Sequence, residues 1–272
     1  MPADPSIDTW TAVVYDSYDI THPPRHPGTG WTRFVCISDN HSFVFPVPPG
    51  DVLLHSGDLS RHGTLKDLEV TLNWMKSLPH AAKFFIAGNH DLVLDRNYEQ
   101  GGSMRTYKPL DVKDKDLAAA RKLVRSKELR KAGMIYLEHE ATTYTSPTGK
   151  AYTIYGSPAA PFFSIGAFQY KEGDGKAIYD RIPASTDILM THTPPFGICD
   201  VTKRKKHAGC AELADRLTHE DLQRCRLHVY GHIHEGHGAA AVAQSPENPS
   251  GRISVNAALP NKPLAIIVDL KD

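Results

Sequence analysis

Short, almost continuous apolar runs recur along the chain, separated by longer stretches in which apolar residues have helical spacing. Strand-sized runs that are apolar at nearly every position are typical of strands buried on both faces of a sheet. This pattern predicts strands at residues 32–38, 52–56, 83–87, 135–138, 152–156, 187–191, 227–231, 253–257 and 264–269. A further edge strand is predicted at residues 10–15.

Three helices are predicted from the spacing of apolar residues. The first covers residues 65–78 and follows Thr64, a suitable N-cap. The second covers residues 114–132 and is followed by Gly133, where a glycine is expected just beyond a helix. The third covers residues 210–217. One face of the first helix carries Leu65, Leu68, Leu72 and Met75.

The order of these elements indicates the fold class. Strands and helices alternate in the first half of the chain, which is typical of parallel strands joined by right-handed crossovers. The second half contains more strand and fewer helices, which favours a second sheet. We therefore predict an α/β fold in which two sheets stack and helices flank them. The length of 272 residues suits one layered domain over residues 1–272.

Two segments are predicted to lack regular structure. Residues 21–30 are rich in Pro and Gly, which favours an extended connector, so we treat residues 1–30 as an N-terminal extension. Residues 95–113 form the longest irregular stretch. Because they follow a candidate active-site motif, we predict that they form a mobile lid.

Charge and composition disfavour several kinds of partner. The chain has 31 Lys and Arg against 31 Asp and Glu, and this balance disfavours a whole-protein grip on long nucleic acid or on an anionic membrane. Four cysteines without a CxxC pair favour a reduced compartment, and we expect an intracellular, cytoplasmic protein. Neither a signal peptide nor an apolar run of about 20 residues is found, so no membrane contact is expected.

Clusters of Asp, Asn and His follow five of the predicted strands. Each cluster alone has an ordinary explanation, such as a tight turn or a solvated strand end. Ligands of open α/β sheets bind at the carboxyl ends of strands, so five clusters at five strand ends are expected to converge. The clusters read SerAspAsnHis (38–41), GlyAspLeuSerArgHisGly (57–63), GlyAsnHisAsp (88–91), ThrHisThrProPro (191–195) and GlyHisIleHis (231–234).

The residue types in these clusters suit two divalent or trivalent transition-metal ions. Imidazole and carboxylate ligate Mn, Fe and Zn alike, so the choice among these metals stays open. Asp39 and His41 lie two residues apart at a strand end, where both can turn onto one ion. Asp58 offers two oxygens that can bridge ions ~3.5–4 Å apart. The other predicted ligands are Asn89, His192, His232 and His234.

Taken together, the five motifs resemble those of the calcineurin-like metallophosphoesterases. Further segments over residues 31–270 resemble the metallophosphoesterase-domain-containing branch of that superfamily. These segments are GlyAspValLeuLeuHisSerGlyAsp (50–58), LeuAsnTrpMetLysSerLeuPro (72–79), IleAlaGlyAsnHisAsp (86–91), IleTyrGlySerProAlaAlaProPhePhe (154–163), AspIleLeuMetThrHisThrProPro (187–195) and LeuHisValTyrGlyHisIleHisGluGly (227–236).

The resemblance implies a four-layer α/β/β/α sandwich of two mixed β-sheets flanked by helices. It also implies which metal each ligand binds. Asn40 stands where the family usually has Thr, but that position is not a ligand. All seven ligand positions are kept, which favours activity. The first metal is assigned Asp39, His41 and His234, the second Asn89, His192 and His232, and Asp58 bridges the two.

A mechanism follows from this assignment. Two cations lower the pKa of a bridging water, and the resulting bridging hydroxide attacks phosphorus in line with the leaving alkoxide. His90 adjoins Asn89 and is the candidate general acid. Asp91 is the candidate that fixes the His90 tautomer, with a turn or helix-start residue as the alternative.

Candidate substrate contacts are fewer. Arg61 and His62 follow Asp58 closely, so they are candidates for binding phosphate oxygens, with a solvated loop as the alternative. The run LysArgLysLys (203–206) either attracts an anionic ligand or is a solvated surface.

The leading functional prediction is a hydrolase of small phosphodiesters. The branch resemblance suggests cyclic nucleotides as substrates, including 2′,3′-cyclic ones. Alternatives on the same site are a broad phosphomonoesterase or nucleotidase and a nuclease, although the neutral charge disfavours long nucleic acid. A metal-binding scaffold protein with weak turnover is a third alternative. The sequence fixes neither the native metals, nor protein partners, nor the oligomeric state.

Overall fold

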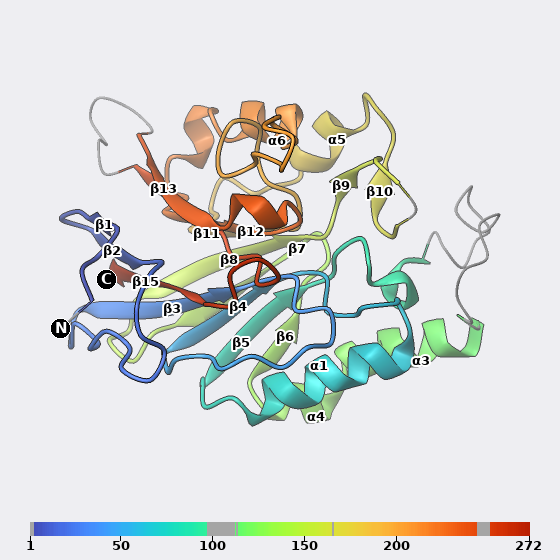
Figure 1. Ribbon diagram of the computed structural model, residues 1–272, viewed down its shortest axis with the longest axis horizontal. Helices are drawn as coiled ribbons and strands as arrows, with labels where there is room; N and C mark the ends of the chain where they lie inside the picture. The colour runs from blue at the N-terminus through green and yellow to red at the C-terminus, as the bar shows by residue number, and fades with distance from the viewer. Residues whose placement is uncertain (1–2, 97–111, 113, 165, 244–250) are drawn as a thin grey trace.

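Two β-sheets lie face to face between two layers of helices in the computed structural model (Figure 1). The residues that the structure describes are 3–96, 112, 114–164, 166–243 and 251–272. The arrangement confirms the predicted α/β class with two mixed sheets and flanking helices. The lid predicted at residues 95–113 lies outside the described residues, apart from 95, 96 and 112.

The first sheet contains most strands of the first half of the chain. Strands β3 to β6 are parallel, whereas β15 is antiparallel to both β3 and β2. The strand predicted at residues 10–15 thus joins the sheet beside the last strand of the chain. The strand order is β1 (Ile7–Asp8), β2 (Ala12–Tyr15), β15 (Ile266–Lys271), β3 (Trp31–Ile37), β4 (Val52–Ser56), β5 (Ala82–Ile86) and β6 (Met134–Tyr136).

The second sheet has a parallel centre and antiparallel edges. Its order is β13 (Gly238–Val242), β14 (Arg252–Asn256), β12 (Leu227–Tyr230), β11 (Ile188–Thr191), β8 (Ala151–Ser157) and β7 (Glu140–Thr145). A separate parallel pair is formed by β9 (Ala160–Pro161) and β10 (Gln169–Tyr170).

Helices cover the outer face of each sheet (Figure 1). The first sheet is covered by α1 (Leu65–Ser77), α3 (Asp114–Val124) and α4 (Lys127–Lys131). The second is covered by α5 (Gly175–Tyr179) and α6 (Ala211–Arg216). Short 3-10 turns are η1 (Leu92–Leu94), η3 (Glu220–Leu222) and η4 (His234–Gly236).

Capping residues set the helix boundaries. The Thr64 hydroxyl accepts a hydrogen bond from the Asp67 amide at 3.1 Å, so α1 begins where predicted. The helix predicted at residues 114–132 is instead two helices, because the Ser126 hydroxyl accepts from the Leu129 amide at 3.3 Å and starts α4. Gly133, with φ of 72°, follows α4 as predicted.

The apolar strands are buried on both faces, as their sequence pattern predicted. In β3, Val35 and Ile37 pack with the helices of the first layer. Phe34 and Cys36 pack against the second sheet, so Cys36 is a core residue. Alternate side chains of one strand therefore fill two different cores. This packing fixes the relative position of the two sheets, and with it the position of their loops.

No helix in the described ranges is long and apolar enough to cross a membrane.

Candidate metal centre

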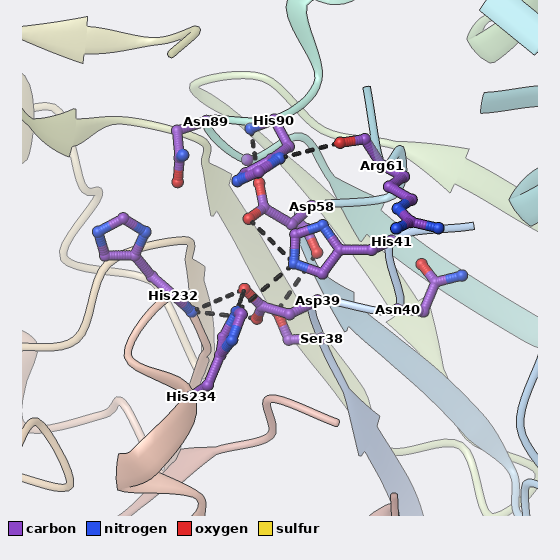
Figure 2. A network of polar contacts seen from close by, with 12 residues as sticks. Ser38, Asp39, Asn40, His41, Asp58, Arg61, Asn89, His90, His232 and His234 are labelled. Carbon is purple, nitrogen blue, oxygen red and sulfur yellow. Dashed lines mark hydrogen bonds and ion pairs between the residues drawn. The ribbon is translucent and has the colours of Figure 1, made fainter. Parts of the chain in front are cut away.

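The candidate ligands lie just beyond the ends of five strands. Figure 2 shows Asp39, His41, Asp58, Asn89, His232 and His234 close together in one site. Asp39, Asp58 and Asn89 follow β3, β4 and β5, which are neighbouring parallel strands. His192 and His232 follow β11 and β12, which are neighbours in the second sheet. Parallel neighbours place their carboxyl ends side by side. The two sheets together therefore gather residues that are far apart in the chain.

One group of candidate ligands consists of Asp39, His41, Asp58 and His234. Their ligand atoms all lie within 4.8 Å of one another. The Nε2 atom of His234 lies 3.2 Å from Oδ1 of Asp39 and 3.5 Å from Nε2 of His41. Two carboxylates and two imidazoles at this separation are a donor set that suits a transition metal.

A second group consists of Asn89, His192 and His232. The Nδ1 atom of His192 lies 2.9 Å from the carbonyl oxygen of Ser56, which accepts only, so Nδ1 carries the proton. The lone pair of Nε2 then faces Oδ1 of Asn89 at 2.9 Å. The rings of His192 and His232 lie 5.0 Å apart. A lone pair directed at an amide oxygen fits a site that holds a cation between them.

Asp58 lies between the two groups. Its Oδ2 atom is 3.7 Å from Nε2 of His41, and its Oδ1 atom is 3.4 Å from Nε2 of His192. The backbone amide of His90 donates to Oδ1 at 2.8 Å and fixes the carboxylate. Each oxygen therefore faces one group, which is the position of a bridging ligand.

Burial favours the neutral form of two candidate ligands, His41 and His232. It lowers the pKa of His41 to about 4 and that of His232 to about 3, and neighbouring histidines add to the effect. Burial also lowers the pKa of His234, but the hydrogen bond and charge of Asp39 outweigh it, so this pKa is raised. Neutral imidazole is the form that ligates metals.

The two carboxylates have opposite pKa shifts. Burial raises the pKa of Asp58 well above its usual value, and the neighbouring Asp39 raises it further. Burial opposes ionisation of Asp39 too, but the hydrogen bond from His234 and the nearby histidines hold its pKa well below the usual range. Two adjacent buried carboxylates repel each other, so a cation between them is favoured. The residues present thus fit a pair of metal ions.

Two motif glycines allow the carboxylates to approach the backbone. A Cβ atom at Gly88 would overlap the carboxylate of Asp58, and one at Gly231 would overlap that of Asp39. The glycines of the GlyAsnHis and GlyHis segments are therefore needed for space, not only for turns.

His90 lies at the rim of the site. Its side chain is exposed, and its ring lies 4.6 Å from the ring of His41. Its Nδ1 atom is 3.2 Å from the carbonyl oxygen of Arg61 (Figure 2). Because a carbonyl only accepts, Nδ1 is the donor in this contact.

The orienting role predicted for Asp91 needs correction. Its carboxylate is fully buried and accepts from the amides of Gly88, Leu59 and Ser60 at 2.8, 3.1 and 2.8 Å, and from the Ser60 hydroxyl at 2.7 Å. The Asp91 carboxylate therefore accepts four hydrogen bonds from these loops. The hydrogen-bond partner of the His90 ring is the carbonyl of Arg61, not Asp91. Asp91 therefore ties the loop after β4 to the loop after β5, which agrees with the alternative of a turn residue.

The side chains of Arg61 and His62 point to other partners. The Arg61 guanidinium lies over the ring of Phe43, 5.4 Å from its centroid. The His62 ring lies 3.5 Å from Oδ2 of Asp67. Both residues are exposed, so their predicted contact with substrate stays a proposal. No sequence signal singles out Ser60, because its hydroxyl contacts a loop 30 residues away.

The fold and the site define a two-sheet α/β protein with a candidate dinuclear metal centre. Comparison with known families agrees, because the sequence model of the calcineurin-like phosphoesterases matches residues 32–236. The chain belongs to the calcineurin-like phosphoesterase family, and within it to the metallophosphoesterase-domain-containing branch. This confirms the resemblance that the five motifs predicted. The family acts on phosphoesters and uses divalent metals.

Several relatives support this membership. Metallophosphoesterase domain-containing protein 1 of Homo sapiens is 34% identical over 93% of this chain and 74% of its own length. The UPF0046 protein C25E10.12 of Caenorhabditis elegans is 33% identical over 76% of this chain and 70% of its own. A protein named probable rhamnogalacturonate lyase C, from Emericella nidulans, is 37% identical over 77% of this chain, but this chain spans only 18% of its length.

A solved crystal structure shares the fold. It aligns with a TM-score of 0.52 over 83% of this chain and 90% of its own, at 14% sequence identity. At that identity the likeness concerns the fold alone.

Proposed function

We propose that this protein is a dinuclear metal-dependent phosphoesterase that hydrolyses small phosphodiesters, with cyclic nucleotides as the candidate substrates. The main support is the position of Asp58, whose two carboxylate oxygens face two different groups of candidate ligands. A carboxylate that serves only to stabilise the fold has no reason to be placed between two sets of metal-binding side chains.

We assign the candidate ligands to two metals in the way that the family resemblance implies. Mn, Fe and Zn all suit these nitrogen and oxygen donors. When bound, such a metal pair supplies an activated water as nucleophile and neutralises charge on the phosphoryl oxygens. The first metal would be held by Asp39, His41 and His234, the second by Asn89, His192 and His232, and both by Asp58.

His90 is proposed to protonate the leaving group. As the phosphorus–oxygen bond breaks, the imidazolium gives the proton on Nε2 to the departing alkoxide. The Nδ1 proton stays in its contact with the Arg61 carbonyl, 3.2 Å away. Exposure at the rim leaves the outer face of the ring free to meet the leaving oxygen, which supports the assignment.

Hydrolysis of bis-p-nitrophenyl phosphate by the pure protein, with Mn²⁺, Fe²⁺ or Zn²⁺ added, tests this proposal. We expect turnover that EDTA abolishes, and a preference for diesters over p-nitrophenyl phosphate. Asp58→Asn should lower the metal content below two ions per chain and abolish turnover. Asp174→Asn, an exposed change outside the site, is the matched control.

A metal-replete sample with no turnover on any phosphoester would favour a scaffold protein. A panel of 2′,3′- and 3′,5′-cyclic nucleotides and of mononucleotides then identifies the preferred class. Faster hydrolysis of monoesters than of every diester would contradict the phosphodiesterase assignment.

We also propose an intracellular, cytoplasmic location. The support is that the four cysteines of the sequence include no CxxC pair and form no dense framework, which favours a reducing compartment. Cell fractionation with an antibody against the chain tests it, and recovery in a secreted fraction would contradict it.

A further inference from the structure

A pocket of about 710 Å³ adjoins the candidate metal centre. His232 lines this pocket and also belongs to the second ligand group, so the pocket and the metal centre share a side chain. The volume lies in the range of sites for small organic ligands. We call it the side pocket. Much of its remaining lining comes from residues 161–163 and from the segment 202–208.

One wall of the side pocket is aromatic. Phe162 and Phe163 are adjacent in sequence and are 62% and 85% exposed. They follow β9, and the Phe162 amide donates to the Tyr170 carbonyl at 2.9 Å, which fixes the backbone. Two neighbouring exposed phenylalanines at the mouth of a pocket are typical of a binding surface. Aromatic faces of this kind stack on nucleobases.

Another wall of the side pocket is basic. It contains Lys203, Arg204 and Lys206 against a single carboxylate, that of Glu235. Among these residues, Lys203 forms an ion pair with Glu235 at 3.8 Å. The wall therefore carries excess positive charge next to the aromatic wall, and this combination suits a ligand with a base and a phosphate.

The basic wall is held in a defined turn. The Thr202 amide donates to the Lys206 carbonyl at 2.9 Å, and Lys205 has φ of 58°. The buried carboxylate of Asp200 joins the two ends of the segment that carries the turn, because it accepts from the amides of Gly197 and Gly209 at 2.9 Å each. Asp200 also accepts from His207 at 2.5 Å. A run of solvated surface lysines would not need such support.

Thr193 also lines the side pocket, and it directly follows His192 in the chain. The pocket therefore extends to a residue next to the second ligand group.

We propose that the side pocket binds the nucleoside part of a nucleotide substrate that carries a second phosphate besides the scissile ester. The base lies against Phe162 and Phe163, and the second phosphate meets Lys203, Arg204 and Lys206. This inference rests on the proposed function, because it assigns the scissile ester to the metal centre. It narrows the substrate class from cyclic nucleotides in general to nucleotides with an additional terminal phosphate.

Equilibrium binding to the metal-loaded protein tests each wall with a matched pair of ligands. Adenosine 3′,5′-bisphosphate should bind about tenfold or more tightly than adenosine 3′-monophosphate, because one phosphate is added opposite three cations. Adenosine 5′-monophosphate should bind at least about fivefold more tightly than ribose 5-phosphate, because a stacked base is added. The tighter binding of the bisphosphate over the 3′-monophosphate should become smaller at high salt.

Variants of each wall test which residues cause these differences in binding affinity. The triple variant Lys203→Gln, Arg204→Gln, Lys206→Gln should remove the gain from the second phosphate and keep the gain from the base. The double variant Phe162→Ala, Phe163→Ala should do the reverse. Lys127→Gln and Trp10→Ala are controls, because both residues are exposed and neither lines the side pocket. Unchanged affinities in both multiple variants would overturn the inference.

Two further outcomes are informative. If these binding differences appear but no phosphoester is hydrolysed, the proposed function fails while the pocket assignment stands. If phosphodiesters are hydrolysed but the variants bind as the wild type does, the pocket assignment fails alone. A tetra-adenylate that binds more than tenfold tighter than the bisphosphate would overturn the free nucleotide as ligand, in favour of a strand end.

Discussion

Four candidate ligands have a backbone conformation that residues other than glycine rarely adopt. The φ angles of Asp39, His41, Asp58 and His232 are 57°, 47°, 53° and 64°. Such left-handed residues cost of order 1–3 kcal/mol each and are found mainly at functional sites. The strained turns after three different strands aim these side chains at one another, which supports their assignment to a common site.

The general-acid role of His90 is tested by the leaving group. His90→Ala should lower kcat for a cyclic nucleotide by ~10²–10⁴-fold, because its alkoxide leaves only when protonated. It should affect bis-p-nitrophenyl phosphate much less, since p-nitrophenolate leaves as an anion. Metal content should be unchanged, because the contact of His90 with Asp58 is through its backbone amide.

Steady-state kinetics with metal analysis checks this prediction. His219→Ala, at an exposed histidine of a different loop, is the control. Equal loss of activity on both substrates would point to a disturbed metal site, and full activity on the nucleotide would remove His90 from the mechanism.

Asp91 is expected to act as a positioning residue. In the wild type, the Asp91 carboxylate accepts from the backbone amides of Leu59, Ser60 and Gly88. In Asp91→Asn, the NH2 group of the new side chain cannot accept a hydrogen bond, so buried donors lose their partner. The free energy of unfolding of the variant should be lower by about 2 kcal/mol, and its affinity for metal should be weaker. Denaturant unfolding and metal titration measure the two effects, with Asp174→Asn as control. A variant of normal stability and metal affinity that has lost only kcat would restore the orienting role.

Among the secondary-structure elements, the apolar runs predicted the central strands and the edge strand β6, but not the edge strands β1, β7 and β13. Strand β7 alternates half-buried and exposed residues, and β13 is a run of Gly and Ala with one Val. Neither has the continuous apolar pattern of a strand buried on both faces. Their places follow from pairing with β8 and β14, which is a tertiary contact. The short pair β9 and β10 was missed for the same reason.

The capping of α1 gives a prediction at this scale. Thr64→Ala should lower the free energy of unfolding by about 1 kcal/mol, because the Asp67 amide loses its acceptor. Thr64→Ser keeps the hydroxyl and should stay close to the wild type. Thermal or denaturant unfolding of the pair measures the difference. Equal loss in both variants would show that the methyl group, not the cap, is what matters.

At the scale of the whole molecule, buried histidines make stability depend on pH. Burial lowers the pKa of His80 to about 4, and the charge of Lys83 adds to this. An unfolded histidine titrates near ~6.5, so between these values the unfolded chain binds a proton that the folded chain does not. The contribution of the neutral, buried His80 to the free energy of unfolding is complete above pH ~6.5 and is lost as the pH falls towards 4.

Removing this histidine should flatten the pH profile. In His80→Leu the loss of unfolding free energy between pH 6.5 and 4 should be smaller, by up to about 3 kcal/mol. The comparison is of slopes measured by urea unfolding at several pH values, since the absolute stability also changes with the side chain. Parallel profiles for the variant and the wild type would contradict the prediction.

Sequence patterns were enough to predict the central strands, the parallel pairing in the first half of the chain and the two-sheet class. These features depend on local patterns: apolar periodicity within a strand and the residues that end it. The seven candidate ligands were proposed from five clusters that follow predicted strands, together with the family resemblance.

The meeting of the side chains became visible in the folded chain alone. There the two oxygens of Asp58 face different groups, Asp91 binds the loop after β4, and the basic turn lines the same pocket as Phe162 and Phe163. Each of these depends on loops from distant parts of the chain and on the packing of one sheet against the other. Local sequence does not encode such distances, because they arise only when both sheets are in place.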